Sequence, residues 1–126
     1  MSNIAIHTEN APAAIGPYSQ AIQAGNTIYV SGQLPIDPAT GALIEGPIAE
    51  MTVQSLRNVV AILEAAGSDL SKVVKTTIFL ADLNDFAEVN AAYAAFFGKI
   101  APARSCVQVA KLPKDARIEI EAIALC

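Results

Sequence analysis

Histidine, cysteine and charged side chains are scarce in this chain, and each shortage excludes a class of site. His7 is the only histidine, and the two cysteines, Cys106 and Cys126, do not have metal-site spacing. Zinc centres and Ser-His-Asp or Cys-His nucleophiles need such residues in sets. We therefore expect neither a metal site nor a catalytic triad. A disulfide is also not expected, because no export signal is visible.

The chain is short of charge and rich in apolar side chains. Of its 126 residues, 16% are charged and 53% hydrophobic, whereas soluble domains have roughly 25% charged residues. No run approaches the ~20 apolar residues that span a bilayer, and the first residues lack the pattern of a secretory signal. We therefore expect a cytoplasmic location, no membrane contact, and subunit interfaces that bury the excess apolar surface.

The charge balance argues against a nucleic-acid partner. Eight basic residues face twelve acidic ones, which gives a net charge of −4, whereas phosphate contacts require a basic surface. Lys111, Lys114 and Arg117 cluster, but Asp115 lies among them. This cluster is interpreted as a solvated turn.

The periodicity predicts a single α+β domain over residues 1–126. Alternating or β-branched segments predict strands at 3–8, 18–24, 27–33, 72–81, 103–110 and 117–125. Helices are predicted at about 48–66, from the spacing of Leu56, Val59, Val60 and Leu63, and after Asp82 as N-cap. The second helix carries an apolar stripe that is interpreted as core: Phe86, Val89, Tyr93, Phe96 and Phe97. Both helices are expected to cover one face of a single mixed sheet.

Alternation in the last strand separates two kinds of side chain. Ile118, Ile120, Ala122 and Ala124 suit the helix-covered face, and the opposite face carries Glu119 and Glu121 followed by Ile123 and Leu125. Such a helix-free face, polar at one end and apolar at the other, is expected to meet water or another subunit. The composition favours a subunit.

Arg104 is the residue that points most directly to chemistry. Arginine grips a carboxylate with two parallel hydrogen bonds, so Arg104 and a carboxylate on a neighbouring strand predict a site for a small acid. Glu119 could activate a water as general base. Two other interpretations stand: Arg104 in a structural ion pair with Glu119 or Glu121, and Glu119 as a solvated carboxylate. Gly32 would permit close approach of a ligand.

Six motifs in the same order resemble the RidA (YjgF) family of reactive-intermediate deaminases, and together they cover essentially the whole chain. They are Asn10-Ala11-Pro12, Gly16-Pro17-Tyr18-Ser19-Gln20, Val30-Ser31-Gly32-Gln33, Asp82-Leu83-Asn84-Asp85-Phe86, Pro102-Ala103-Arg104-Ser105-Cys106-Val107 and Ile118-Glu119-Ile120-Glu121-Ala122. The resemblance implies a chorismate-mutase-like fold, assembled as a homotrimer with a central barrel and three clefts between subunits. It also implies hydrolysis of enamines and imines, such as 2-aminoacrylate and 2-aminocrotonate, to 2-keto acids and ammonia, without a cofactor.

The same resemblance assigns roles to seven residues of this sequence. By motif, Arg104 binds the substrate carboxylate and Glu119 positions or activates the attacking water. The substrate-binding residues that it implies are Tyr18, Ser31, Gly32, Asn90 and Cys106, the last acting through its backbone. One departure is the segment 97–101, which is shorter than in some members and places the side-chain preference in doubt. A non-catalytic sensor of 2-keto acids is the alternative, and a ribonuclease, translation-inhibitor or chaperone-like role is a third.

Overall fold

The computed structural model describes residues 2–126, which form one layer of strands and one of helices. The elements are β1 (Ile4–Ile6), β2 (Ala21–Ala24), β3 (Thr27–Gln33), β4 (Ile36–Asp37), β5 (Ala42–Leu43), α1 (Ile48–Ala65), β6 (Val73–Leu80), α2 (Phe86–Ala94), β7 (Ala103–Gln108) and β8 (Ile118–Leu125). Three 3-10 turns cover Leu70–Lys72, Leu83–Asp85 and Pro113–Asp115.

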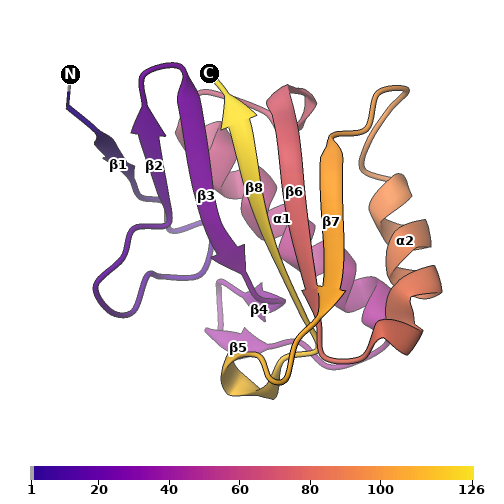
Figure 1. Cartoon of the computed structure of the whole chain (residues 1–126). Coiled ribbons are helices and arrows are strands. Elements are labelled where there is room, and N and C mark those ends of the chain that lie inside the picture. The colour runs from indigo at the N-terminus through magenta and orange to yellow at the C-terminus, as the bar shows by residue number, and fades with distance from the viewer. Residues whose placement is uncertain (1) are drawn as a thin grey trace.

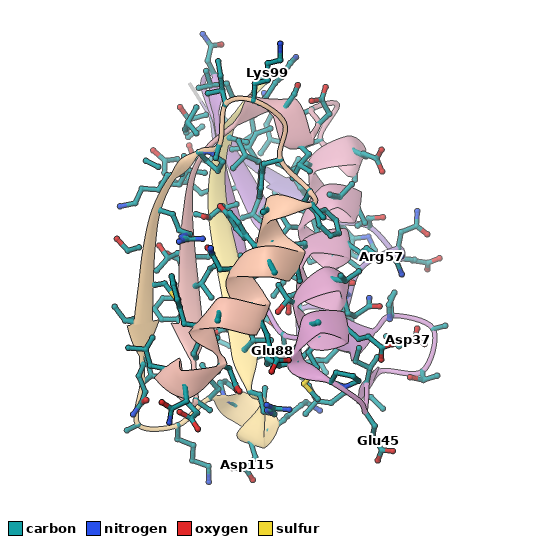
Figure 2. All side chains as sticks on the ribbon, turned by 90° about the vertical axis from the view of Figure 1, so that its right-hand side faces the viewer. Asp37, Glu45, Arg57, Glu88, Lys99 and Asp115 are labelled. Carbon is teal, nitrogen blue, oxygen red and sulfur yellow. The ribbon has the colours of Figure 1, made fainter. Side chains whose placement is uncertain are left out.

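Six strands form the main sheet in the order β1-β2-β3-β8-β6-β7. Only β6 and β7 run parallel; the other neighbours are antiparallel. In Figure 1 α1 lies behind this sheet and α2 lies beyond its β7 edge, and Figure 2 shows the two layers edge-on, with α2 in front. The prediction of an α+β fold with one mixed sheet and two helices on one face is confirmed.

The core forms between α1 and the helix-facing side of the sheet. Ile118, Ile120, Ala122 and Ala124 are buried, as the alternation predicted, and Leu56, Val59 and Leu63 of α1 are buried with them. Val60 is only partly buried. Each large apolar side chain buried in this way stabilises the fold by about 1.5–3 kcal/mol.

Two local predictions need correction. The turn at Asp37–Gly41 closes a short hairpin, β4–β5, which forms a separate two-stranded sheet that the sequence did not predict. Asp82 caps the 3-10 turn that precedes α2, by accepting a hydrogen bond from the Asn84 backbone N–H at 2.9 Å, so α2 begins at Phe86. Residues 82–85 therefore form a capped 3-10 turn, and the α-helix starts only after it.

The position of β7 is the most consequential difference from expectation. Arg104 was predicted to lie on a strand next to the strand of Glu119, but β6 lies between β7 and β8. In the parallel β6–β7 pair, Arg104 is opposite the buried Thr76 and therefore faces the helices. Glu119 is opposite Phe79 and lies on the helix-free face. Arg104 and Glu119 thus lie on opposite faces of the sheet.

The helix-free face carries apolar side chains that no other element of residues 2–126 covers. Tyr29, Val107 and Leu125 are each between 44% and 50% exposed. They come from β3, β7 and β8, so the apolar surface extends across the sheet that faces the viewer in Figure 1. Within residues 2–126, no helix has the length and apolar character needed to cross a bilayer.

Candidate active site, divided between two faces

The predicted site residues fall into two separate cavities. Tyr18, Ser31, Gly32 and Glu119 line a cavity of about 750 Å³. Asn90 and Arg104 line another, of about 410 Å³. Cys106 lines neither of them. The sequence therefore identified parts of two surfaces and did not predict their separation.

The larger cavity is mainly apolar and has two carboxylates in its wall. Its lining residues are Pro12, Ala13, Ile15, Tyr18, Gln20, Ser31, Gly32, Gln33, Leu34, Ile36, Pro113, Lys114, Glu119 and Glu121. Burial raises the pKa of Glu119, and the nearby Glu121 carboxylate raises it further. A carboxylate whose pKa is raised is a stronger base than an ordinary one, which suits proton abstraction from water.

A bulge in β3 brings the backbone close to Glu119. Between Val30 and Gln33 the pairing with β8 shifts by one residue, so Ser31 and Gly32 leave the regular ladder. A Cβ at position 32 would lie 2.7 Å from the carboxyl carbon of Glu119. The absence of a Cβ at position 32 thus leaves room for the Glu119 carboxylate, whereas the sequence had predicted room for a ligand. The Ser31 hydroxyl donates to the Ser19 carbonyl at 2.6 Å and links the bulge to the segment before β2.

Buried amide side chains hold two walls of the same cavity. Gln20, 2% exposed, donates from Nε2 to the Thr8 and Pro12 carbonyls at 3.0 and 2.8 Å and accepts from the Thr8 backbone N–H at 2.7 Å. Asn58 of α1 donates from Nδ2 to the Leu34 and Ile36 carbonyls at 3.1 and 2.9 Å. Because buried polar groups are costly to leave unpaired, these amides fix irregular segments against the core.

The smaller cavity presents the Arg104 guanidinium. Its Nη1 donates to Asn90 Oδ1 at 2.8 Å, and its Cζ lies 5.0 Å from the Tyr93 ring centroid and 5.5 Å from that of Phe86. Such distances correspond to cation–π contacts. Tyr93 is fixed in turn, because its hydroxyl lies 2.7 Å from Thr76 Oγ1 in a buried hydrogen bond. The sequence assigned both rings to the core; Tyr93 is buried there, but Phe86 is 37% exposed, so that prediction is wrong for Phe86.

Within residues 2–126, Arg104 has no carboxylate partner. The two salt bridges there join Lys111 to Asp115 and Arg117 to Asp85. The interpretation of Arg104 as one half of an intrachain ion pair with Glu119 or Glu121 is therefore wrong. The guanidinium is oriented by a neutral amide and two rings, and its remaining N–H groups are available to an anion.

Cys106 is two residues after Arg104 on β7, and its side chain packs against the core on the helix-covered side of the sheet. Burial raises the pKa of its thiol, and the opposing influence of Arg104 is smaller. A thiol of raised pKa holds its proton at neutral pH and is a poor nucleophile. Both cysteines are free. Among residues 2–126, no group of three His, Cys, Asp or Glu side chains could hold a metal ion.

Several residues of the larger cavity were missed by the sequence. Ile15, Gln33 and Leu34 carry no chemical signal of their own, and Lys114 was interpreted as part of a solvated turn. Such positions can be assigned to the cavity only from the structure, because they lie in segments that are distant in sequence and adjacent in space. Figure 1 shows how this occurs, since the turn between β7 and β8 lies beside β4 and β5 at one end of the sheet.

The fold and the two cavities define a small α+β protein with a cationic surface on one face and a carboxylate-bearing cavity on the other. The family model described as Endoribonuclease L-PSP matches residues 8–126. A 2-iminobutanoate/2-iminopropanoate deaminase from Salmonella typhimurium is 59% identical over 123 residues, or 95% of each chain. The chain belongs to this family, which is the RidA (YjgF) family that its motifs resemble.

Solved structures agree with this assignment. YyfA from Yersinia pestis, described as a Rid family protein of unknown function, has a TM-score of 0.96 and 51% identity, with 99% of this chain and 100% of that chain covered. TdcF from Escherichia coli, solved with bound serine, has a TM-score of 0.93 and 46% identity, with 98% of both chains covered.

Proposed function

We propose that this protein hydrolyses reactive 2-imino acids, and the enamines that tautomerise to them, to 2-keto acids and ammonia. Substrates of this class include 2-aminoacrylate and 2-aminocrotonate. The 59% identity to the Salmonella deaminase supports the proposal. So does the serine bound to TdcF, because serine carries the α-carboxylate that such a substrate also has.

The observation that carries this proposal is the environment of the Arg104 guanidinium. Its guanidinium is oriented by Asn90 and two aromatic rings and has no carboxylate within residues 2–126. An oriented cation without an internal partner is suited to a planar carboxylate. In this role Arg104 binds the substrate carboxylate and Asn90 keeps the guanidinium in place.

Glu119 supplies the base in the proposed reaction. It accepts a proton from water while the water oxygen forms a bond to the imine carbon, and the C=N π electrons move to nitrogen. The protonated carboxyl then returns its proton to the nitrogen of the carbinolamine. The hydroxyl proton of the neutral carbinolamine then moves to the amino group, the C–N bond breaks, and ammonia and the 2-keto acid are released. An imine is already electrophilic, so positioning supplies much of the acceleration.

The remaining predicted residues have supporting roles in this scheme. Tyr18 shapes the larger cavity, and Ser31 with Gly32 brings the backbone up to the reacting water. Cys106 borders the substrate through its backbone. The reaction needs no cofactor, because the imine carries its own electrophile and the water its own nucleophile.

A complete site requires two copies of the chain, and we assign the protein as a homotrimer with three clefts between subunits. The positions of Arg104 and Glu119 on opposite faces of the sheet support this assembly. The exposed Tyr29, Val107 and Leu125 of the helix-free face support it as well. In the trimer these faces line a central barrel, and Arg104 of one subunit meets Glu119 of the next.

A coupled assay tests the activity. Threonine dehydratase generates the enamine, and release of 2-oxobutanoate is followed with wild type, Arg104→Ala and Glu119→Gln. Acceleration by wild type that both substitutions abolish supports the deaminase. Binding of 2-oxobutanoate should survive in Glu119→Gln and be lost in Arg104→Ala. Binding by wild type without any acceleration would identify a keto-acid sensor.

Mixed oligomers test whether the cleft is shared. Arg104→Ala and Glu119→Gln are each inactive alone, but their coexpression gives some clefts an intact Arg104 from one chain and an intact Glu119 from another. Random assembly of a cyclic oligomer restores about a quarter of the clefts. Recovery near that level supports shared sites, whereas no recovery would place each site within one chain. Salt-sensitive RNA binding by wild type would instead support the endoribonuclease description of the family.

A further inference from the structure

The turn before β8 has an unfavourable backbone conformation. Lys114 and Asp115 have φ values of 59° and 56°, and they are the two non-glycine residues with positive φ among residues 2–126. This left-handed region is disfavoured for residues with a Cβ. Strained residues of this kind persist where the surroundings fix them, and they concentrate at functional sites.

The strained turn directs one lysine to the larger cavity. Lys114 is the cationic residue of the cavity lining, which also includes Glu119 and Glu121. Lys111, in the same turn region, pairs with Asp115 at 3.2 Å, whereas Lys114 is in neither of the ion pairs within residues 2–126. Lys114, which is exposed, and the two carboxylates therefore line the same cavity, and the lysine has no ion-pair partner within residues 2–126.

The charges of this cavity pose a problem for an anionic substrate. Glu119 and Glu121 together repel a 2-imino carboxylate, and Arg104 lies on the opposite face of the same sheet. A positive charge on the cavity wall would offset that repulsion. Lysine suits this task because its flexible stem carries a compact charge that meets anions without fixed geometry.

We propose that Lys114 is a second cationic contact for the substrate, which draws the anion past the two carboxylates to Arg104 of the neighbouring subunit. This inference rests on the proposed deaminase function and extends it by making the enzyme selective for anionic imines. The left-handed turn maintains the lysine at the cavity wall. Lys114 is thus a specificity-determining residue that acts in substrate capture, outside the chemical step.

Two charge-matched variants test the proposal. Lys114→Gln and Lys111→Gln each remove one positive charge from the same region, but only the first changes the cavity. At low ionic strength we expect kcat/KM of Lys114→Gln to fall about fivefold to tenfold through KM, with kcat retained, because local charge steers substrate entry. The deficit should shrink in high salt. Lys114→Arg should restore most of the loss, and Lys111→Gln should match wild type.

A second variant separates the charge from the fold. Glycine adopts positive φ without a Cβ penalty, so Lys114→Gly should melt no lower than wild type and show the same loss of kcat/KM. Asp115→Gly relieves the neighbouring residue and should keep full kcat/KM. A lower melting temperature in Lys114→Gly would contradict the premise of strain. Equal kcat/KM for Lys114→Gln and Lys111→Gln would overturn the proposal, and an inactive wild type would instead overturn the deaminase function.

Discussion

The backbone of Gly32 lies so close to the Glu119 side chain that a Cβ at position 32 would overlap with its carboxylate. An added Cβ would be 2.7 Å from both the carboxyl carbon and Oε2 of Glu119. Real Cβ atoms do not approach other atoms so closely, so a larger residue would have to displace this carboxylate. The bulge in β3 thus restricts the position of the Glu119 carboxylate, the proposed base.

Gly32→Ala should therefore impair catalysis more than folding. Displacement of the Glu119 carboxylate by about 1 Å should reduce kcat roughly 10²-fold, while the free energy of unfolding falls by about 1–3 kcal/mol. The coupled deaminase assay and urea unfolding measure the two effects. Gly67→Ala is the control: Gly67 has φ of 79°, and a Cβ added there would have no atom within 4 Å, so that variant should lose stability and keep kcat. Equal kcat in both variants would contradict this account.

The activity should fall in acid at a higher pH than an ordinary glutamate predicts. Burial raises the pKa of Glu119, and Glu121 adds to the shift; the base works only when deprotonated, so protonation on the acid side abolishes turnover. Glu121→Gln removes the repulsion and should move the acid limb of the kcat/KM profile to lower pH. Glu45→Gln, which changes the net charge equally outside both cavities, should leave it in place. An equal shift of the acid limb in both variants would indicate a general effect of net charge.

Glu119→Gln should raise stability at neutral pH. The folded state raises the pKa of Glu119, so it binds the proton more tightly than the unfolded chain does. Stability is consequently lost as the pH rises through the folded-state pKa. The neutral glutamine avoids that loss, and its advantage should shrink as the pH falls towards the unfolded-state value. Urea midpoints at neutral and mildly acidic pH measure this difference, and an advantage that grew in acid would contradict the sign.

Asn90→Ala should weaken substrate binding through Arg104. The variant removes the 2.8 Å hydrogen bond that orients the guanidinium, leaving only the two rings to hold it. We expect KM to rise about fivefold to tenfold, equivalent to about 1–1.5 kcal/mol, with a smaller change in kcat. Asn84→Ala, in the turn before α2, is the matched control and should behave as wild type. A change confined to kcat would place Asn90 in the chemical step.

Gln20→Met should loosen one wall of the larger cavity. Methionine has similar length, but it leaves the Thr8 backbone N–H and the Pro12 carbonyl without their buried partner. The expected loss of stability is about 1–3 kcal/mol, and hydrogen exchange of the Thr8 amide should accelerate. Gln23→Met, in β2 just after Gln20, is the control, since the one side-chain hydrogen bond of Gln23 is exposed and 3.4 Å long. Unchanged exchange at Thr8 would show that the wall does not depend on Gln20.

Local patterns in the sequence predicted the layers of this fold well. Alternation placed Ile118 and Ile120 against the helices, and the strands predicted at 18–24 and 27–33 correspond to β2 and β3. These signals work because side-chain direction and turn conformation depend on neighbouring residues. The β4–β5 hairpin escaped prediction because each of its strands has only two residues, too few to show a period.

The arrangement of the site depended on information that local patterns do not contain. Alternation within β7 places Arg104 and Cys106 on one face of the sheet, but no periodicity indicates that β7 pairs with β6 and not with β8. Strand order is set by contacts between distant segments. Lys114 was missed for a related reason: its left-handed conformation is imposed by the surrounding turn, and lysine gives no local sign of it.

If the cleft is shared between subunits as proposed, the placement of Arg104 and Glu119 on opposite faces of one sheet would make activity depend on protein concentration. A single folded copy would hold either half of the cleft without its complement, so dilution below the dissociation constant of the assembly should silence the enzyme while circular dichroism remains unchanged. The cell would thus obtain an activity threshold from geometry alone. A subunit carrying one defect would also impair a neighbour whose own sequence is intact.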